Sequence, residues 1–278
     1  MSICHQKHFP VMLAEVLQAL CPKDGETYVD ATFGNGGYTE AILQKANCRV
    51  IALDRDATVL PRVEEIKQLY GHRFDFRLGR FGDFDKLVGE NINGAVFDIG
   101  VSSMQLDQAK RGFSFAKDAP LDMRMSQEGQ TAADLVNTLP EEELADILFN
   151  FGEEKKSRQI ARKIAEARKT KPITSTLELA HIIHQVVKRS FDQAIDPATR
   201  SFQALRIAVN DELNELQKGL EKAADKLISG GRLVVVDFHS LEDRIVKTFF
   251  KNNSEKTIHV SRYRPQQTST SDAVFGFA

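Results

Sequence analysis

A glycine-rich turn between an apolar segment and a helical pattern constrains this 278-residue chain more than any other feature. The stretch reads Tyr28-Val29-Asp30-Ala31-Thr32-Phe33-Gly34-Asn35-Gly36-Gly37-Tyr38-Thr39, and the apolar residues of positions 41–43 follow it. A strand, a glycine turn and a helix in that order form a nucleotide-type pocket. Glycine lets the backbone approach a ligand closely, and the helix N-terminus offers free N–H groups. Taken alone, the stretch fits a tight strand-to-helix turn without a ligand equally well.

The next apolar run favours the ligand-binding interpretation. Positions 49–53 are a continuous strand-like segment that ends in Asp54, which lies 17 residues after Gly37 (54 − 37). An acidic side chain about 20 residues beyond the glycines suits hydrogen bonds from ribose hydroxyls. The dinucleotide motif G-x-G-x-x-G is absent, because Thr39 stands where the third glycine would fall. The pattern therefore favours a nucleoside cofactor without a pyrophosphate, such as S-adenosylmethionine.

Composition limits the class of protein and its partners. With 42% hydrophobic and 27% charged residues and a formal net charge of −2, the chain is typical of a globular protein without a global nucleic-acid signature. Any RNA contact must come from local basic patches. The three cysteines, Cys4, Cys21 and Cys48, show no metal-ligand spacing, so no metal site is predicted. No membrane-length apolar run and no signal or transit pattern is present, which predicts a cytoplasmic protein.

Strand-like and helical segments alternate along the first hundred residues. Strands are predicted at 28–31, 49–53, 74–78 and 94–97, with helices at 11–20, up to about 45 and at 59–70. A fifth strand is predicted at 233–238, followed by a helix. This alternation predicts an α/β, doubly wound, Rossmann-like parallel sheet. Asp30, Asp54, Phe81 and Asp98 all come at the carboxyl ends of strands, where such sheets bind ligands.

The alternation stops after Asp98, where helical patterning without a convincing strand continues to about residue 201. The sequence therefore predicts a cofactor-binding domain of residues 1–104 and 202–278, and a helical insertion of residues 105–201. A basic helix from Lys155 to Lys171 follows an acidic one that begins after Pro140. It is either a nucleic-acid backbone-binding face or a solvated surface with some internal pairing. Residues 202–227 are predicted as one long helix, and residues 258–260 as a short strand.

Many separate motifs in the same order make the chain resemble the ribosomal RNA small subunit methyltransferase H family. The resemblance spans about residues 8–251. It rests on the glycine loop and on Ala52-Leu53-Asp54-Arg55-Asp56, Asp98-Ile99-Gly100-Val101-Ser102-Ser103, Arg111-Gly112-Phe113-Ser114-Phe115, Pro120-Leu121-Asp122-Met123-Arg124-Met125, Gly152-Glu153-Glu154-Lys155, Phe202-Gln203-Ala204-Leu205-Arg206 and Phe238-His239-Ser240-Leu241-Glu242-Asp243-Arg244. The family methylates the 4-amino group of a decoding-region cytidine in 16S ribosomal RNA.

The resemblance implies a class I methyltransferase that uses S-adenosylmethionine and acts on small-subunit ribosomal RNA or the assembled small subunit. The implied cofactor contacts are Gly36, Gly37, Tyr38, Asp54, Phe81, Asp98 and Gln105. Two departures stand out. Tyr38 replaces the family's usual histidine, and the family's basic Asn-Pro-Arg and Ser-Ala-Lys-Leu-Arg pattern is not found before Ala278.

Asp98 and His239 are the catalytic candidates. Asp98 either orients the cofactor or accepts a hydrogen bond from the attacking amine, and the former is preferred. His239 is either a proton acceptor or RNA contact, or a helix N-terminal residue beside a Ser240 cap. The Asp/Asn-Pro-Pro-aromatic motif of other amino-methyltransferases is absent, because Ile99, Gly100 and Val101 follow Asp98.

Six further residues are candidates for substrate contacts. Phe113 and Phe115 either stack on an extruded base or pack in a core, and arginines either hold phosphates or form internal ion pairs; the arginines are Arg111, Arg124, Arg206 and Arg244. Two other functions are weighed against the RNA methyltransferase. One is a DNA amino-methyltransferase, which the missing proline-aromatic motif disfavours. The other is a ribosome-assembly factor that binds RNA and has lost catalysis, which intact Gly36, Asp54 and Asp98 disfavour.

Overall fold

The structure is a computed structural model that describes residues 10–188, 195–253, 259–263 and 272–276. The chain divides into two compact units, residues 1–100 with 213–278, and residues 101–212. The sequence placed the second boundary at 201/202, within the helix Thr199–Asn210 (α10). This helix instead belongs to the inserted unit, because Phe202, Ala204 and Leu205 are buried in that unit's core.

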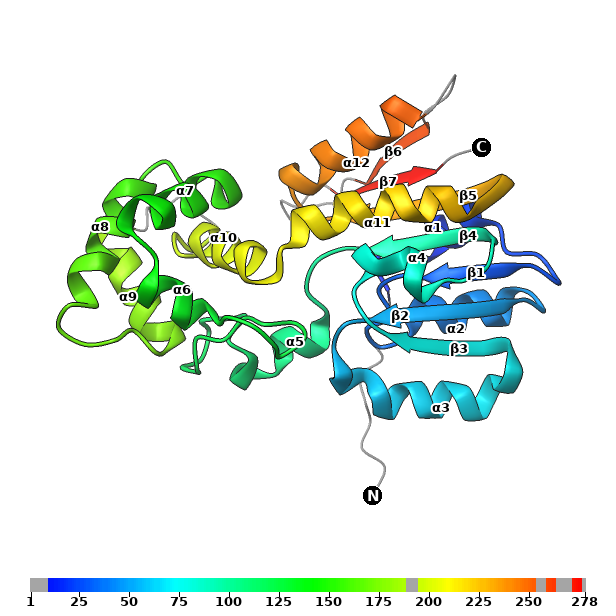
Figure 1. The fold of residues 1–278 in the computed structure, drawn as a ribbon, viewed down its shortest axis with the longest axis horizontal. Coiled ribbons are helices and arrows are strands. Elements are labelled where there is room, and N and C mark those ends of the chain that lie inside the picture. Colours follow the sequence, from blue (N-terminus) through cyan, green and yellow to red (C-terminus); the bar gives the residue numbers. More distant parts are fainter. Residues whose placement is uncertain (1–9, 189–194, 254–258, 264–271, 277–278) are drawn as a thin grey trace. The chain divides into compact units, whose positions relative to one another are not determined.

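The larger unit is built on a seven-stranded sheet with the order β3-β2-β1-β4-β5-β7-β6 (Figure 1). The first five strands are parallel. Strand β7 runs antiparallel to β5, and β6 antiparallel to β7. The strands are β1 (Thr27–Asp30), β2 (Arg49–Asp54), β3 (Phe74–Leu78), β4 (Ile92–Asp98), β5 (Leu227–Asp237), β6 (His259–Tyr263) and β7 (Asp272–Gly276). The predicted doubly wound, Rossmann-like fold is confirmed.

Helices cover both faces of this sheet, because successive side chains of each buried strand point to opposite sides. Val29 and Ile51 lie in a core with α4, α11 and α12, whereas Tyr28 and Val50 lie in a core with α1, α2 and α3. The helices are α1 (Leu13–Leu20), α2 (Gly37–Lys45), α3 (Leu60–Tyr70), α4 (Phe84–Leu87), α11 (Glu212–Lys226) and α12 (Ser240–Asn253). Three short 3-10 turns, η1 (Ala57–Val59), η2 (Gly71–Arg73) and η3 (Phe81–Asp83), lie between strands and helices.

The prediction of one helix over residues 202–227 is wrong. The chain forms α10 and α11, which are separated by Asp211 in the left-handed conformation (φ 54°). Aspartate tolerates this conformation better than most residues. The apolar residues nevertheless keep their helical spacing across this break. The sequence pattern therefore gives no sign that one helix ends and another begins at Asp211. Leu205 is buried in the core of the inserted unit, and Leu216 and Leu220 in a core of the sheet unit.

The last part of the sheet also differs from the prediction. Gly230 and Gly231 lie inside β5, which begins at Leu227 and shifts its register against β4 between Ile92 and Gly94. The predicted strand near residues 258–260 corresponds to β6, although residue 258 lies outside the described residues. Strand β7 was not predicted. The sequence also indicates a loop over residues 264–272; residues 264–271 lie outside the described residues, and Asp272 is instead the first residue of β7.

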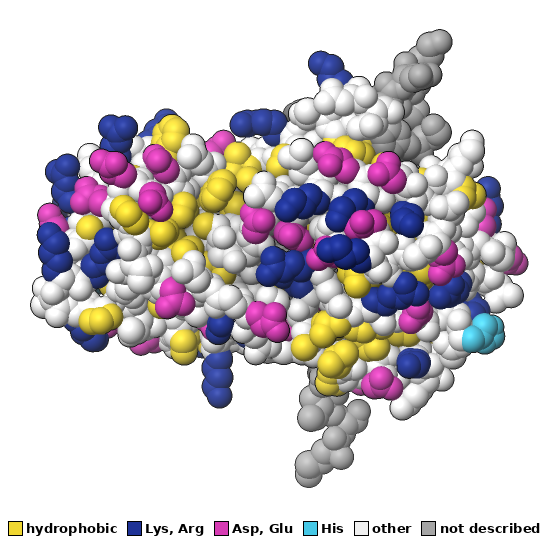
Figure 2. Space-filling model, viewed as in Figure 1, with side chains coloured by type: hydrophobic (Ala, Val, Ile, Leu, Met, Phe, Trp, Pro, Cys, Tyr) yellow, Lys and Arg dark blue, Asp and Glu magenta, His cyan; other side chains and the backbone are white. Residues whose placement is uncertain are grey.

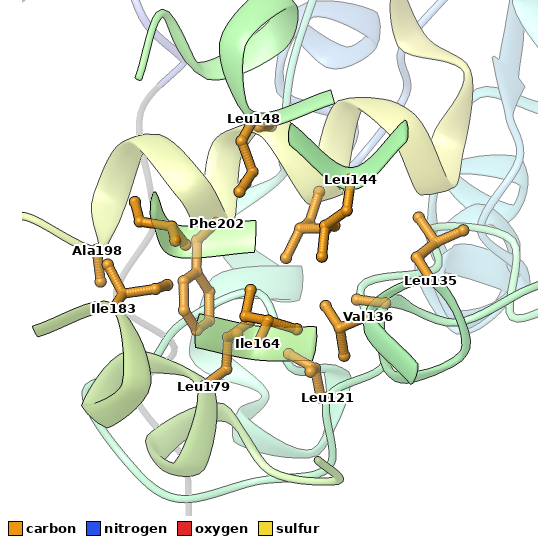
Figure 3. Close-up of a cluster of buried hydrophobic side chains, with 14 of the residues drawn as sticks. Leu121, Leu135, Val136, Leu144, Leu148, Ile164, Leu179, Ile183, Ala198 and Phe202 are labelled. Atoms are coloured by element: carbon orange, nitrogen blue, oxygen red, sulfur yellow. The ribbon is translucent and has the colours of Figure 1, made fainter. Parts of the chain in front are cut away.

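The inserted unit is helical, as predicted. Its elements are α5 (Ser103–Asp107), η4 (Ala109–Arg111), α6 (Ala132–Thr138), α7 (Glu141–Gly152), α8 (Ser157–Ala167), α9 (Thr176–Val186) and α10. Capping boxes at Ser102, Thr131 and Ser175 start three of these helices. Leu144, Ile164 and Phe202 from different helices point into one apolar core (Figure 3). Among residues 101–188 and 195–212 the structure has no strand, only an isolated bridge between Pro120 and Ser175.

Candidate active site

The glycine loop joins β1 to α2 at the carboxyl edge of the sheet. Gly34 (φ 51°) and Gly36 (φ 75°) have the left-handed conformation that favours glycine. A Cβ on Gly36 would lie 2.9 Å from the Phe33 ring, and one on Gly37 would overlap Pro10. Side chains at positions 36 and 37 would therefore disturb the chain's own packing.

Asp30 supports this loop through its side-chain hydrogen bonds. Its Oδ2 accepts hydrogen bonds from the Thr39 amide (3.1 Å) and hydroxyl (2.7 Å), and its Oδ1 accepts one from the Thr32 amide (3.2 Å). The side chain is buried, and burial raises its pKa to about 6 against the lowering effect of these hydrogen bonds. Asp30 therefore holds the start of α2 to the end of β1.

Asp54 ties the glycine loop to the next strand. Its Oδ2 accepts a hydrogen bond from the Gly34 amide (2.8 Å), and its Oδ1 accepts one from the Asp56 amide (2.8 Å). A carboxylate offers about four lone-pair sites, so acceptor capacity remains for ligand hydroxyls. Burial raises the pKa of Asp54 to about 6, although the two amide hydrogen bonds lower it. Asp54 thus connects the glycine loop to the end of β2.

The affinity for a ribose-bearing cofactor is expected to fall by about tenfold for each pH unit below pH 6. The ionised Asp54 carboxylate accepts charge-assisted hydrogen bonds from hydroxyls, and its protonation near pH 6 weakens that acceptor. Calorimetric titration between pH 7.5 and 5 measures this. The control is Asp30→Asn, which should keep the fall because Asp30 contacts only the loop. A constant affinity across this range in the unmodified protein would contradict the assignment.

The ends of β3 and β4 bring two more predicted residues to the same edge of the sheet. Phe81 follows β3 in the turn η3 and contacts Phe97 edge-on, with 5.6 Å between ring centroids. Asp98 is half-buried at the end of β4, and its amide donates to Thr32 Oγ1 (2.7 Å). The sequence did not single out Thr32. The Thr32 hydroxyl joins the loop after β1 to the end of β4. In the sequence, only its position two residues after Asp30 could have indicated this role.

Tyr38 is buried in the chain's own core. Its side chain packs among residues of α1 and α2, and its hydroxyl donates to the carbonyl of Val11. The implied contact of Tyr38 with a cofactor stays a prediction, and this placement makes a contact through its backbone more favourable than one through its side chain.

His239 lies at the start of α12, with both ring nitrogens facing Glu242. Its Nδ1 accepts a hydrogen bond from the Glu242 amide (3.4 Å), and its Nε2 lies 3.1 Å from Oε1 of the buried Glu242 carboxylate. His239 therefore occupies the N-cap position, one residue before the cap that the sequence suggested. This arrangement favours the structural alternative over a role as proton acceptor.

The remaining candidates lie in the inserted unit, except for Arg244, which is exposed on α12. Gln105 is buried, and its side chain closes the capping box with Ser102 (3.1 Å). Arg111 is buried and donates to the carbonyls of Arg124 (2.9 Å) and Met125 (2.8 Å). These positions favour structural roles for Gln105 and Arg111.

Two further arginines form ion pairs inside this unit. Arg124 is paired through two nitrogens with Asp122 (2.9 and 2.7 Å), and Arg206 likewise with the buried Glu212 (2.8 and 2.8 Å). Such two-point contacts use the guanidinium groups that a phosphate contact would need. Internal pairing is therefore the better supported alternative for both.

The aromatic candidates and the basic helix also have partners within the inserted unit. Phe113 is buried in the core of this unit. Phe115 is half-buried, and the centroid of its ring lies 4.6 Å from the centroid of the Phe202 ring. On the basic helix, Arg162 pairs with Glu141 of the acidic helix (3.7 Å), which confirms the predicted internal pairing. Lys155 and Arg158 are exposed, so a backbone-binding face stays a prediction for this part of the surface.

The part of the chain that the structure describes contains neither a cluster of potential metal ligands nor a helix able to span a membrane. Within it, no group of three or more His, Cys, Asp or Glu side chains could hold a metal ion. Among the same residues, no helix has the length and apolarity needed to cross a bilayer.

Comparison with known proteins decides the family. Residues 5–271 match the model of the MraW methylase family. The chain belongs to the MraW methylase family. Two ribosomal RNA small subunit methyltransferase H proteins are close relatives. The one from Rhodospirillum rubrum is 56% identical over 266 residues, which cover 94% of this chain and 81% of the relative. The one from Rickettsia massiliae is 57% identical over 260 residues, which cover 93% and 84%.

Membership in the MraW methylase family makes this chain a methyltransferase. The structural match to a solved rRNA methylase from Streptococcus thermophilus covers 98% of this chain and 97% of that protein. The sequence identity is 14% and the TM-score is 0.46. A likeness of that size adds nothing to the family assignment.

Proposed function

We propose that this MraW family member transfers a methyl group from S-adenosylmethionine to the 4-amino group of a decoding-region cytidine in small-subunit ribosomal RNA. The observation that carries the proposal is the Asp54 carboxylate, which accepts the Gly34 amide at the carboxyl edge of the sheet. This pairing joins the acidic residue and the glycine loop into one site. The close relatives are named for a ribosomal RNA substrate, which supports the choice of acceptor.

The residues at this edge fit an adenosine-type cofactor. Asp54 keeps acceptor capacity for the two ribose hydroxyls, Phe81 offers an apolar ring for adenine, and the loop glycines permit close approach. When bound, the cofactor supplies a methyl group already activated by its positive sulfur. The work of the chain is mainly to position and align the reactants.

Asp98 is proposed to orient the cofactor. Its amide is held by Thr32, which fixes the end of β4 beside the glycine loop. The alternative role is to accept a hydrogen bond from the cytidine amine, whose lone pair is delocalised into the ring. Acceptance there would favour the attacking geometry and offset the positive charge that develops before the amine loses its proton.

The Asp98→Asn variant distinguishes these two roles. Loss of one charge-assisted hydrogen bond to the cofactor should raise its dissociation constant about tenfold. Calorimetry measures this constant, and single-turnover methylation at saturating cofactor measures the rate. An unchanged dissociation constant with a reduced rate would instead assign Asp98 to the amine.

The inserted unit is proposed to recognise the substrate, with naked ribosomal RNA or the assembled small subunit as partner in the cytoplasm. The exposed Lys155 and Arg158, before and on α8, and Arg244 on α12 are the proposed phosphate contacts. They are preferred over Arg111, Arg124 and Arg206, whose guanidinium groups contact the chain itself.

Nucleoside mass spectrometry tests the proposal. The protein is incubated with S-adenosylmethionine and unmodified small subunits, naked small-subunit RNA, or DNA of matched sequence, and the digest is searched for methyl on the cytosine 4-amino group. Product on either RNA substrate, and none on DNA, is expected. Product on DNA alone would make the chain a DNA methyltransferase. Cofactor binding without product on any substrate would favour an RNA-binding assembly factor.

A further inference from the structure

The turn η3, which carries Phe81, is held by one face of α11. Glu215, Gly219 and Lys222 follow one another at spacings of four and three residues, so they share a side of this helix. We refer to these three residues as the turn clamp. All three, and η3, belong to the sheet unit.

Two residues of the turn clamp bind both polar groups of one peptide position. The Gly82 amide donates to Glu215 Oε2 (3.2 Å), and Lys222 Nζ donates to the Gly82 carbonyl (2.7 Å). Lys222 Nζ also lies 2.7 Å from Asp85 Oδ1, and Glu215 Oε1 lies 3.9 Å from Arg80. Glu215 is buried, and glutamate is rarely buried unless it is paired, as it is here with the Gly82 amide.

The third residue of the turn clamp sets how closely the Phe81 ring lies on the helix. A Cβ on Gly219 would be 2.8 Å from Phe81 Cδ2 and 3.2 Å from the Phe81 carbonyl oxygen. The ring is confined on another side by Phe97. Alanine has the higher helix propensity by about 1 kcal/mol, so glycine here disfavours the helix itself. Its presence is explained by the position that it allows the ring to take.

The charged surface around α11 agrees with a local positioning role. Figure 2 shows Lys and Arg side chains interspersed with Asp and Glu side chains where α11 and α4 lie in Figure 1. Lys222 pairs with Asp85, and Lys86 with Asp83 (2.6 Å). These two cations therefore pair with carboxylates of η3 and α4.

We infer that the turn clamp positions Phe81 to pack against the adenine of the cofactor. Glu215, Gly219 and Lys222 are positioning residues, because they act through Phe81 and its turn. This inference rests on the proposed function and deepens it. A ring already held in its binding position avoids the ordering cost of immobilising it when the cofactor binds.

Calorimetric titration with S-adenosylmethionine tests the inference through a double-mutant cycle. Gly219→Ala should lower affinity about tenfold, since a displaced ring loses its contact with adenine. In a Phe81→Leu background, the same substitution should lower affinity less than about twofold, because non-additivity marks residues that act through one another. A purely structural role would leave the two losses additive. Additive losses, or unchanged affinity in Gly219→Ala, would overturn the inference.

A second pair of variants keeps the test decisive if Gly219→Ala does not fold. Glu215→Ala removes the acceptor of the Gly82 amide, whereas Glu215→Gln retains a carbonyl oxygen at that place and should restore most of the affinity. Lys222→Met removes the donor to the Gly82 carbonyl and should also lower the affinity. Its matched control is Lys218→Met, because Lys218 is exposed on α11, and the control for Gly219→Ala is Gly89→Ala. A Cβ on Gly89 would meet nothing within 4 Å. Failure of Glu215→Gln to restore affinity, or equal losses in the controls, would also overturn the inference.

The unmodified protein separates this inference from the proposed function. If it fails to bind S-adenosylmethionine, the proposed function fails and the inference with it. If it binds and the turn-clamp variants bind equally well, the inference alone fails.

Discussion

Replacing Asp54 with alanine is expected to weaken the binding of S-adenosylmethionine by at least about 100-fold. Each hydrogen bond to a charged group contributes roughly 1.5–3 kcal/mol, and two ribose hydroxyls would lose their acceptor together. The substitution also releases the Gly34 amide, which Asp54 holds at 2.8 Å. Both effects act on the same loop, so the loss should exceed that of any other single substitution at this edge. Isothermal calorimetry at pH 7.5 measures it.

Asp75→Ala is the matched control for this result. Asp75 lies near the beginning of β3, away from the carboxyl edge, and pairs with Arg77 (2.8 Å) and Arg49 (3.5 Å). Removing a carboxylate there should leave the affinity within about twofold, because partly exposed ion pairs contribute roughly 0–1 kcal/mol to stability and Asp75 is remote from the loop. An Asp54→Ala protein that binds the cofactor about as tightly as the unmodified chain would disprove the placement of the ribose.

Replacing Arg206 with alanine is expected to destabilise the inserted unit by about 3–5 kcal/mol. The Arg206 side chain is 15% exposed and that of Glu212 6%, and the two form a two-point ion pair across the Asp211 break. Alanine would leave the Glu212 carboxylate buried without this partner. Urea unfolding, followed by circular dichroism, should show a midpoint shift confined to the transition of this unit.

Two variants test the physical reason for that loss. Arg200→Ala removes an exposed arginine from the same helix and should change stability by less than about 0.5 kcal/mol. The double variant Arg206→Met/Glu212→Leu should recover most of the stability, because apolar residues can replace a buried ion pair. If Arg206→Ala lost RNA affinity while its unfolding matched that of Arg200→Ala, Arg206 would be a phosphate contact instead.

Local patterns were sufficient to predict the five parallel strands and the residues at their carboxyl edge. Most of these strands contain an apolar run and β3 alternates, and the ends of parallel strands lie at one edge of the sheet. For this reason Asp30, Asp54, Phe81 and Asp98 could be grouped by their spacing along the chain, and the fold places each of them where β1, β2, β3 or β4 ends. The alternation of strands and helices predicted the doubly wound arrangement on the same basis.

The roles of individual side chains could not be predicted in this way. Arg111 and Arg206 look like phosphate ligands in a sequence, because a guanidinium serves equally well for a phosphate, a carboxylate or backbone carbonyls. Only folding brings the carbonyls of Arg124 and Met125 to Arg111, and Glu212 to Arg206. His239 is a similar case, since its contacts with Glu242 depend on where α12 begins.

The sequence by itself determined the five parallel strands, the glycine loop and the acidic residue at the end of the second strand, since these depend on spacing and on alternation over short distances. The tertiary structure alone decided that residues 202–227 form two helices, because the apolar stripe keeps its period through Asp211 while its two halves face different cores. It also decided that the turn clamp of α11 contacts the turn that carries Phe81, which lies far earlier in the chain. Contacts at that separation follow from how the helix packs on the sheet, and no local pattern encodes them.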